Sequence, residues 1–188
     1  MRQSRLLCLL VLSAVLQGCF PVLATGVGSG ALMATDRRSS GIYIEDEAIE
    51  NKALARIGEQ FKQRVHVNVT SFNRKVLLTG EVPDEATRAG IGKTAAAVEN
   101  VRDVHNATVV ALPSSLTSRS NDALLTSKVK LNFTNNKRFS PNHVKVVTEN
   151  EVVYLLGLVK RAEADAASEI ASTTGGVRKV VRMFEYLD

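Results

Sequence analysis

The sequence contains no tryptophan, two cysteines, three histidines and few aromatic residues of any kind. Without a platform of rings, there is little on which nucleotide bases could stack, which argues against nucleic acid as a partner. The His-Glu-x-x-His and Gly-x-Ser-x-Gly patterns of common zinc and serine hydrolases are also missing. These absences predict a protein that is not an enzyme and that holds no metal or other cofactor.

The first residues have the pattern of a targeting signal. Arg2 and Arg5 precede an apolar run at residues 6–15, which is shorter than the roughly 20 residues of a membrane-spanning helix. The run ends in Leu-Gln-Gly-Cys19, which resembles the lipobox of bacterial lipoproteins. That resemblance implies cleavage before Cys19, a diacylglycerol on its sulfur and a third acyl chain on the new N-terminus. The alternative is an ordinary cleaved signal peptide with an incidental cysteine.

Removal of the signal at residues 1–18 would leave Cys19 as the only cysteine and exclude an internal disulfide. Phe20 follows it, whereas an Asp at that position marks lipoproteins that stay at the inner membrane. The expected location is therefore the periplasmic face of an outer membrane. Residues 20–34 are rich in Gly, Ala, Val and Ser and predict a flexible chain, so we expect a lipidated tether over residues 19–44.

The rest of the chain contains an internal repeat. Residues 67–80 and 144–157 each run thirteen steps from a Val to a Gly, with Asn73 or Asn150 between two β-rich runs. A duplicated supersecondary unit explains such spacing. Each copy predicts the order helix, strand, strand, helix, strand. The predicted fold class is α+β: two tandem αββαβ modules, each a three-stranded mixed sheet covered on one face by two helices.

Helical periodicity and turn chemistry give the expected elements of each copy. The first helices show apolar residues at i+4 spacing: Ile49, Ala53, Ile57 and Phe61 in one copy, and Leu125, Val129 and Phe133 in the other. Asp46 or Glu47, and Asn121 or Asp122, are candidates for the helix starts. The modules are expected at residues 45–112 and 120–188, with residues 112–120 as linker. Each core is small, so we expect the modules to touch.

The repeated pattern resembles the BON domain of bacterial envelope proteins. The resemblance rests on the hairpins ending in Gly80-Glu-Val and Gly157-Leu-Val, the Ala-rich helices and the closing Val-x-x-Val at residues 101–104 and 177–180. Two copies behind a lipobox resemble the dual-BON outer-membrane lipoproteins, a lipid-binding type associated with division and outer-membrane stress. The lead-in segment at residues 34–41 and Thr148-Glu-Asn150 resemble the same subgroup.

The resemblance implies a protein that binds anionic phospholipid through the first helix of its second module and supports envelope integrity. The sequence departs from the subgroup at Leu124, where an aromatic residue is common. Leu124 and Leu131 lie off the predicted core stripe, although the phase of the helix leaves open that either is a core residue. Both are candidates for insertion among the headgroups.

Charge favours the same helix. Residues 45–112 carry a net charge of −1 and residues 113–188 a net charge of +3, and no acidic residue occurs between Asp122 and Glu149. This acid-free window contains five basic residues: Lys128, Lys130, Lys137, Arg138 and Lys145. Basic residues near an anionic bilayer contribute roughly 1 kcal/mol each. The candidate lipid-binding residues are Leu124, Lys128, Lys130, Leu131, Lys137 and Arg138.

Three alternatives stay open at this point. The basic window could be a solvated face that only maintains solubility. The modules could instead form an adaptor for outer-membrane assembly or division proteins, because small sheets with open edges recruit partners. His66 and His143 occupy equivalent positions, which favours a shared structural role over a catalytic one. Asp84-Glu85 suits a helix start rather than a catalytic pair.

Overall fold

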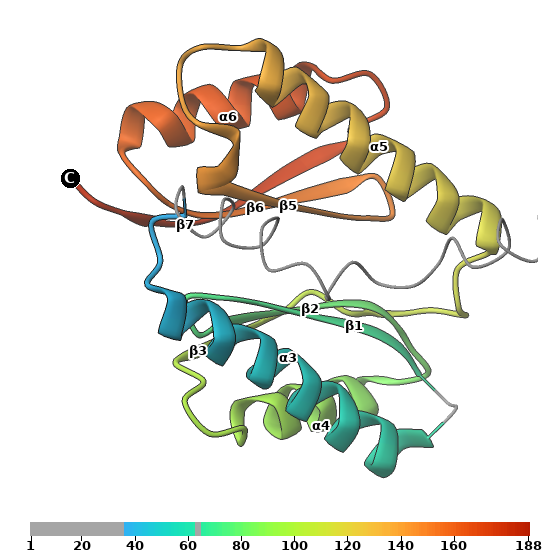
Figure 1. Ribbon diagram of the computed structural model, residues 1–188. Coiled ribbons are helices and arrows are strands. Elements are labelled where there is room, and N and C mark those ends of the chain that lie inside the picture. The colour runs from blue at the N-terminus through green and yellow to red at the C-terminus, as the bar shows by residue number, and fades with distance from the viewer. Residues whose placement is uncertain (1–35, 63–64) are drawn as a thin grey trace, which may run out of the picture. The chain divides into compact units, whose positions relative to one another are not determined.

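The computed structural model describes residues 36–62 and 65–188 (Figure 1). The expected signal peptide, Cys19 and the expected tether up to residue 35 lie outside these residues. Within the described part of the chain, no helix is both long and apolar enough to cross a bilayer.

The first module has the predicted αββαβ order. It consists of α3 (Ser40–Phe61), β1 (His66–Phe72), β2 (Lys75–Val82), α4 (Glu85–Ala96), β3 (Asp103–Asn106) and β4 (Val109–Val110). β1 pairs with β2 in antiparallel fashion, and β2 pairs with β3 and β4 in parallel fashion. The last strand of this module is thus divided into β3 and β4. At the break, the Asn106 side chain accepts hydrogen bonds from the backbone N–H and the hydroxyl of Thr108.

The second module repeats the arrangement with an unbroken last strand. It consists of α5 (Leu116–Asn135), the short 3-10 helix η2 (Pro141–His143), β5 (Val144–Glu149), β6 (Val152–Val159), α6 (Arg161–Thr173) and β7 (Lys179–Tyr186). β6 lies in the middle, antiparallel to β5 and parallel to β7. The predicted fold class is therefore confirmed.

Both leading helices begin earlier than the sequence predicted. Ser39 and Ser115 are the N-caps, and their hydroxyls accept hydrogen bonds from the backbone N–H groups of Ile42 and Ser118. α3 therefore begins inside the segment expected to be tether, and α5 begins inside the expected linker. The proposed caps near Asp46 and Asp122 were wrong, because both residues lie more than one turn inside their helices.

Asp46 and Asp122 instead hold the hairpin turns. The Asp46 carboxylate accepts the backbone N–H groups of Asn73 and Arg74, and Asp122 does the same for Asn150 and Glu151. All four turn residues have φ between 49° and 65°, as a two-residue type I′ hairpin turn requires. The buried carboxylate supplies the acceptors that those two amides would otherwise lack.

Each sheet is covered on both faces. One face packs on its own two helices, around Val76, Leu78 and Ile91 in the first module and around Val153, Leu155 and Ala167 in the second. The other faces meet in a shared apolar layer with four buried members, Phe72, Leu77, Tyr154 and Leu156. The helices lie on the outer sides of the two facing sheets (Figure 1). The expectation that the modules touch is confirmed.

Candidate functional site

The outward side of α5 presents an apolar strip. Leu125, Val129 and Phe133 point into the core, whereas Leu124 and Leu131 are 62% and 60% exposed. Residues three, four and seven apart share one side of a helix, so Leu124 and Leu131 lie together on the side opposite the core. The uncertainty over the phase of this helix is resolved: neither leucine is a core residue.

Basic side chains flank this strip. At about 100° per residue, Lys128 and Lys130 fall on either side of the two leucines. Both lysines are exposed, as are Lys137 and Arg138 in the loop after the helix. Arg138 forms an ion pair of 2.7 Å with Glu169. The three lysines have no ion pair with any described residue, so they carry most of the free positive charge here.

No carboxylate offsets these lysines along the outer surface of the helix. The only acidic residue in α5 is Asp122, which is buried and accepts the turn amides of the second hairpin. The acid-free window of the sequence thus covers most of α5, the loop after it and β5 up to the residue before Glu149. Of its five basic residues, Arg138 pairs with Glu169 and Lys145 with Glu50, and the other three have no ion pair among the described residues.

The sequence interpretation missed two further exposed leucines. Leu116, the first residue of α5, is 79% exposed, and Leu112 in the preceding linker is 89% exposed. Leu116 stands eight residues before Leu124 on the same outward half of the helix. Its spacing from Leu124 was the available signal, but those residues were assigned to a linker. Three exposed leucines therefore lie on the outward half of α5, at residues 116, 124 and 131.

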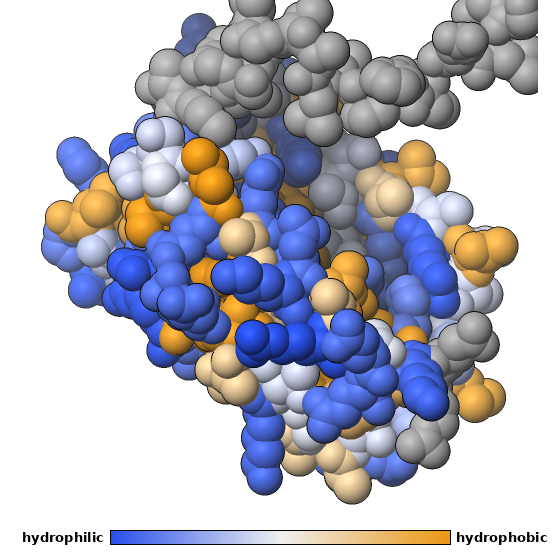
Figure 2. All heavy atoms as spheres, turned by 60° about the horizontal axis from the view of Figure 1, so that its bottom comes forward, coloured by the Kyte–Doolittle hydropathy of each residue, from blue (hydrophilic) through white to orange (hydrophobic). Residues whose placement is uncertain are grey.

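The outer helices of the first module have a different surface. Figure 2 brings forward the lower side of Figure 1, where α3 and α4 lie, and shows mostly hydrophilic side chains with apolar ones in small separate groups. Ile44 and Leu54 are exposed on α3, but acidic residues are frequent along the same helix. The first module thus offers matched positions for control substitutions.

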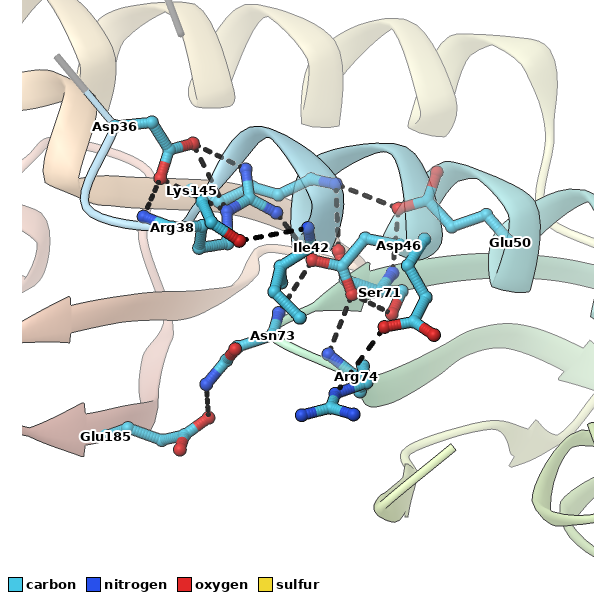
Figure 3. Close-up of polar contacts among 12 residues, drawn as sticks. Asp36, Arg38, Ile42, Asp46, Glu50, Ser71, Asn73, Arg74, Lys145 and Glu185 are labelled. Carbon is cyan, nitrogen blue, oxygen red and sulfur yellow. Dashed lines mark hydrogen bonds and ion pairs between the residues drawn. The ribbon is translucent and has the colours of Figure 1, made fainter. Parts of the chain in front are cut away.

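Lys145, the last basic residue of the acid-free window, is turned toward the first module. Its ammonium donates to Glu50 at 2.9 Å and to the backbone oxygen of Ser71 at 3.3 Å (Figure 3). A second polar contact between the modules involves Glu185 of β7, which accepts from the side chain of Asn73 at 3.0 Å. These contacts border the shared apolar layer.

The lead-in segment contacts both modules. Arg38 donates to Asp36 and to the buried Asp46 of the first module (Figure 3). Arg37 donates two hydrogen bonds, of 2.6 and 2.8 Å, to the carboxylate of Glu163 at the start of α6, and a third to the backbone oxygen of Leu158. The chain therefore reaches α3 between the two modules and is fixed to each.

The position of Arg37 affects the pKa values of Glu163 and His143. Hydrogen bonds from Arg37 lower the pKa of Glu163 to about 2. Burial lowers the pKa of His143, and the positive charge of Arg37 lowers it further. The nearest carboxylate oxygen of Glu163 is 3.7 Å from Nδ1 of His143.

The two histidines that coincide in the repeat occupy the same structural position. A Cβ on Gly80 or Gly157 would collide with the backbone oxygen of His66 or His143, so each glycine lets its hairpin close against the histidine backbone. Their imidazoles have different surroundings: Nδ1 of His66 lies 2.9 Å from the Glu81 carboxylate, whereas Nδ1 of His143 has no hydrogen-bond partner among the described residues. The equivalence therefore lies in the backbone.

Other polar groups considered from the sequence have structural roles. The Asp84 carboxylate caps α4 by accepting the backbone N–H of Thr87 at 2.6 Å, as expected for a carboxylate at a helix start. Among the described residues, no group of three or more His, Cys, Asp or Glu side chains is arranged to hold a metal ion. The positive, leucine-bearing side of α5 remains the most distinctive surface of the described chain.

Comparison with known proteins accounts for the duplicated architecture. Residues 45–111 and 121–188 each match the BON domain. The chain belongs to the BON-domain family. The resemblance inferred from the hairpins and closing strands is confirmed, with two BON domains in tandem.

Two relatives show how far this likeness extends. The outer membrane lipoprotein DolP of Haemophilus influenzae is 38% identical over 187 residues, covering 98% of this chain and 97% of the relative. The 21 kDa hemolysin of Actinobacillus pleuropneumoniae is 32% identical over 154 residues, covering 81% of this chain and 79% of the relative. Among solved structures, the C-terminal domain of Chlamydia trachomatis CdsD reaches a TM-score of 0.31 at 11% identity and covers 72% of this chain and 97% of its own. That similarity is too low to bear on function.

Proposed function

We propose that this BON-domain protein is a non-enzymatic outer-membrane lipoprotein, held through Cys19 at the periplasmic face, whose second module binds anionic phospholipid and supports envelope integrity. The observation that carries the proposal is the outer side of α5. Exposed Leu124 and Leu131 lie there between Lys128 and Lys130, with no exposed carboxylate on the helix. The full-length similarity of this chain to a protein named an outer membrane lipoprotein supports the proposed location at the outer membrane.

The chemistry of the surface suits a bilayer interface. Ammonium groups on long side chains reach phosphates while leucines between them enter the headgroup layer. Each lysine near an anionic leaflet contributes roughly 1 kcal/mol, so three engaged lysines would give a weak, salt-sensitive affinity. An acylated N-terminus would make that affinity effective, because it confines the module to the membrane surface at high local concentration.

The proposed lipid-binding residues are expected to contribute unequally to the binding affinity. Leu124, Leu131, Lys128 and Lys130 lie on the helix itself. Lys137 extends the positive surface into the following loop, whereas Arg138 is partly neutralised by Glu169. We therefore expect Arg138 to contribute less than any of the lysines.

Vesicle co-sedimentation tests the proposal. The chain from residue 19, with Cys19 replaced by Ser to remove the acyl chains, is mixed with vesicles of phosphatidylcholine alone or with phosphatidylglycerol added. We expect binding only to the anionic vesicles. The double substitution Lys128→Glu and Lys137→Glu should weaken that binding at least tenfold, because two attractive charges become repulsive.

The matched control reverses two charges in the first module. Lys52→Glu with Lys62→Glu makes the same change in net charge at exposed positions of α3 and its C-cap, and it should leave vesicle binding within about twofold of the parent chain. Equal binding to neutral vesicles, or equal losses in both double variants, would disprove a specific surface on α5.

A second candidate, the adaptor role, has one observation in its favour. A depression of about 500 Å³ lies between α4 and the edge strand β3. The side of α4 that lines it carries only small residues at positions 89, 92 and 96, which are Ala89, Gly92 and Ala96. An extended segment of an assembly or division protein could add to such an edge. Photo-crosslinking from position 92 in intact cells tests this role. The adaptor role predicts a crosslink to one protein, and the yield of that crosslink should not depend on anionic lipid.

A further inference from the structure

The place where the lead-in segment joins the second module contains a histidine with an unused nitrogen. Nδ1 of His143 is buried and has no hydrogen-bond partner among the described residues. Oε1 of Glu163 lies 3.7 Å from it, which is beyond hydrogen-bond distance. The same oxygen accepts a 2.8 Å hydrogen bond from the guanidinium of Arg37. Two basic side chains thus face one carboxylate oxygen, and of these two Arg37 holds the hydrogen bond.

The Glu163 carboxylate is held in a fixed position. Its Oε2 accepts hydrogen bonds from Arg37 at 2.6 Å and from the backbone N–H of Lys160 at 2.8 Å, at the start of α6. The pKa of Glu163 is lowered to about 2, chiefly by the hydrogen bonds from Arg37. Glu163 therefore stays ionised over the whole range in which a histidine titrates, and it can accept a hydrogen bond throughout that range.

Four elements place charged side chains around η2: the lead-in segment with Asp36 and Arg37, α6 with Glu163, α5 with Lys130 and β5 with Lys145. The neighbouring strand β6 has no charged residue. Burial is the main cause that lowers the pKa of His143, and Arg37 lowers it further, whereas Glu163 and Asp36 raise it. The net direction is down from the ordinary value of 6.5. Removal of Arg37 from this position would therefore make protonation of His143 easier.

The first module provides an internal comparison. Aligning the hairpin turns places His66 at the position of His143. The same alignment places Ala86 at the position of Glu163. His66 has a carboxylate within hydrogen-bond distance, because its Nδ1 lies 2.9 Å from Glu81. A proton on His66 strengthens an existing contact, whereas a proton on His143 creates a donor whose closest acceptor is already used by an arginine.

We infer that acid releases the lead-in segment from the second module. When His143 takes up a proton from solvent, its imidazolium becomes a second cation beside the Glu163 carboxylate and displaces the guanidinium of Arg37 from it. Glu163 then holds the imidazolium, and Arg37 moves into solvent with its positive charge. Arg38 keeps its ion pair with Asp46, so the lead-in segment stays on the first module.

Proton uptake by His143 and release of Arg37 favour each other. In the attached state Arg37 lowers the pKa of His143. In the released state that cause is gone and Glu163 remains, so the released state binds the proton more tightly. Its population therefore rises as the pH falls below 6.5. The response is complete far above the pH of about 2 at which Glu163 itself takes up a proton.

NMR of the chain from residue 19, with Cys19→Ser, measures the release directly. The heteronuclear NOE of the Arg37 Nε–H group reports whether the guanidinium is held, and the Nε–H group of Arg38 is the reference. We expect the fraction of released Arg37 to rise about fivefold from about pH 7.5 to about pH 5.5, while Arg38 stays ordered. His143→Gln should abolish the change, and the matched substitution His66→Gln should leave it intact. Equal order of Arg37 at both pH values, or the same loss of order in His143→Gln, would overturn the inference.

Arg37→Gln tests the coupling from the other side without altering the histidine. Imidazole ¹H–¹⁵N spectra follow His143 and His66 in one sample. Because the neutral amide no longer opposes the imidazolium, we expect the proton affinity of His143 to rise at least about threefold. The titration curve of His66 should be the same with and without the substitution. An unchanged or lower proton affinity of His143 would show that Arg37 and the proton do not compete.

Asp36→Asn identifies the carboxylate that receives the imidazolium. Asp36 also raises the pKa of His143, so it is the other candidate acceptor. With Glu163 as the acceptor, the acid release of Arg37 persists in Asp36→Asn. Loss of the pH response in this variant would assign the imidazolium to Asp36 and overturn the exchange at Glu163. None of these measurements uses lipid, so their outcome is independent of the vesicle experiment.

Discussion

Lys145 of β5 donates a 2.9 Å hydrogen bond to Glu50 of α3, so a charged pair joins the second module to the first. Both side chains are about a third exposed. In a double-mutant cycle with Lys145→Gln and Glu50→Gln, we expect a coupling energy of about 0.5–1 kcal/mol, the usual range for a partly solvated pair. Chemical unfolding measures it, and the coupling should fall in high salt. A coupling indistinguishable from zero at low salt would show that the pair does not stabilise the contact.

Loss of Asp46 should destabilise the protein more than loss of Asp122. Asp46 accepts hydrogen bonds from Arg38, from the Ser71 hydroxyl and from two turn amides, whereas Asp122 accepts only two turn amides among the described residues. We expect Asp46→Ala to cost about 3–5 kcal/mol, as for breaking a buried charged pair, and Asp122→Ala about 1–3 kcal/mol. Urea unfolding followed by circular dichroism gives both values. The reverse order would contradict this account of the turns.

Stability should depend on Glu163 at acidic pH. Its pKa in the folded protein is about 2, below the ordinary value of 4.5. A depressed pKa contributes stability that is fully present above about pH 4.5 and is lost as the pH falls toward 2. The difference in unfolding free energy between the parent chain and Glu163→Gln should therefore shrink across this range. Glu59→Gln, at an exposed position without an ion pair among described residues, serves as the control and should show no such trend.

Leu116 should contribute to membrane binding although it was not among the sequence-based candidates. It is more exposed than Leu124 and lies on the same outward half of α5. Partial burial of a leucine side chain in the headgroup layer is worth roughly 1 kcal/mol, so Leu116→Ser should weaken binding to anionic vesicles about three- to fivefold. Ile44→Ser, an exposed apolar position on α3, is the matched control. If both substitutions act equally, the effect is not specific to α5.

Sequence periodicity predicted most of the fold. The spacing of Leu125, Val129 and Phe133 identified the core side of α5, and Asn73 and Asn150 marked the two hairpin turns. The helix starts were harder to predict because Asp46 and Asp122 are good N-cap residues by type. Their carboxylates are used by turns more than 25 residues away in the chain, and local patterns contain no information on such contacts.

The candidate site was predictable in part. The acid-free window indicated which helix is positive, and the structure shows that Leu124 and Leu131 are exposed on it. The sequence could not show that Lys145 turns away to Glu50 or that Arg138 pairs with Glu169, since both partners come from other elements.

The attachment of the lead-in segment has a mechanical consequence. Arg37 is fixed to Glu163 and Arg38 to Asp46, so consecutive residues are bonded to different modules. A pulling force that arrives along the chain from the N-terminal side would be divided between the two domains before it reaches the first turn of α3. Tension on a lipid anchor would then act on both domains at their junction. It would not separate one domain from the other.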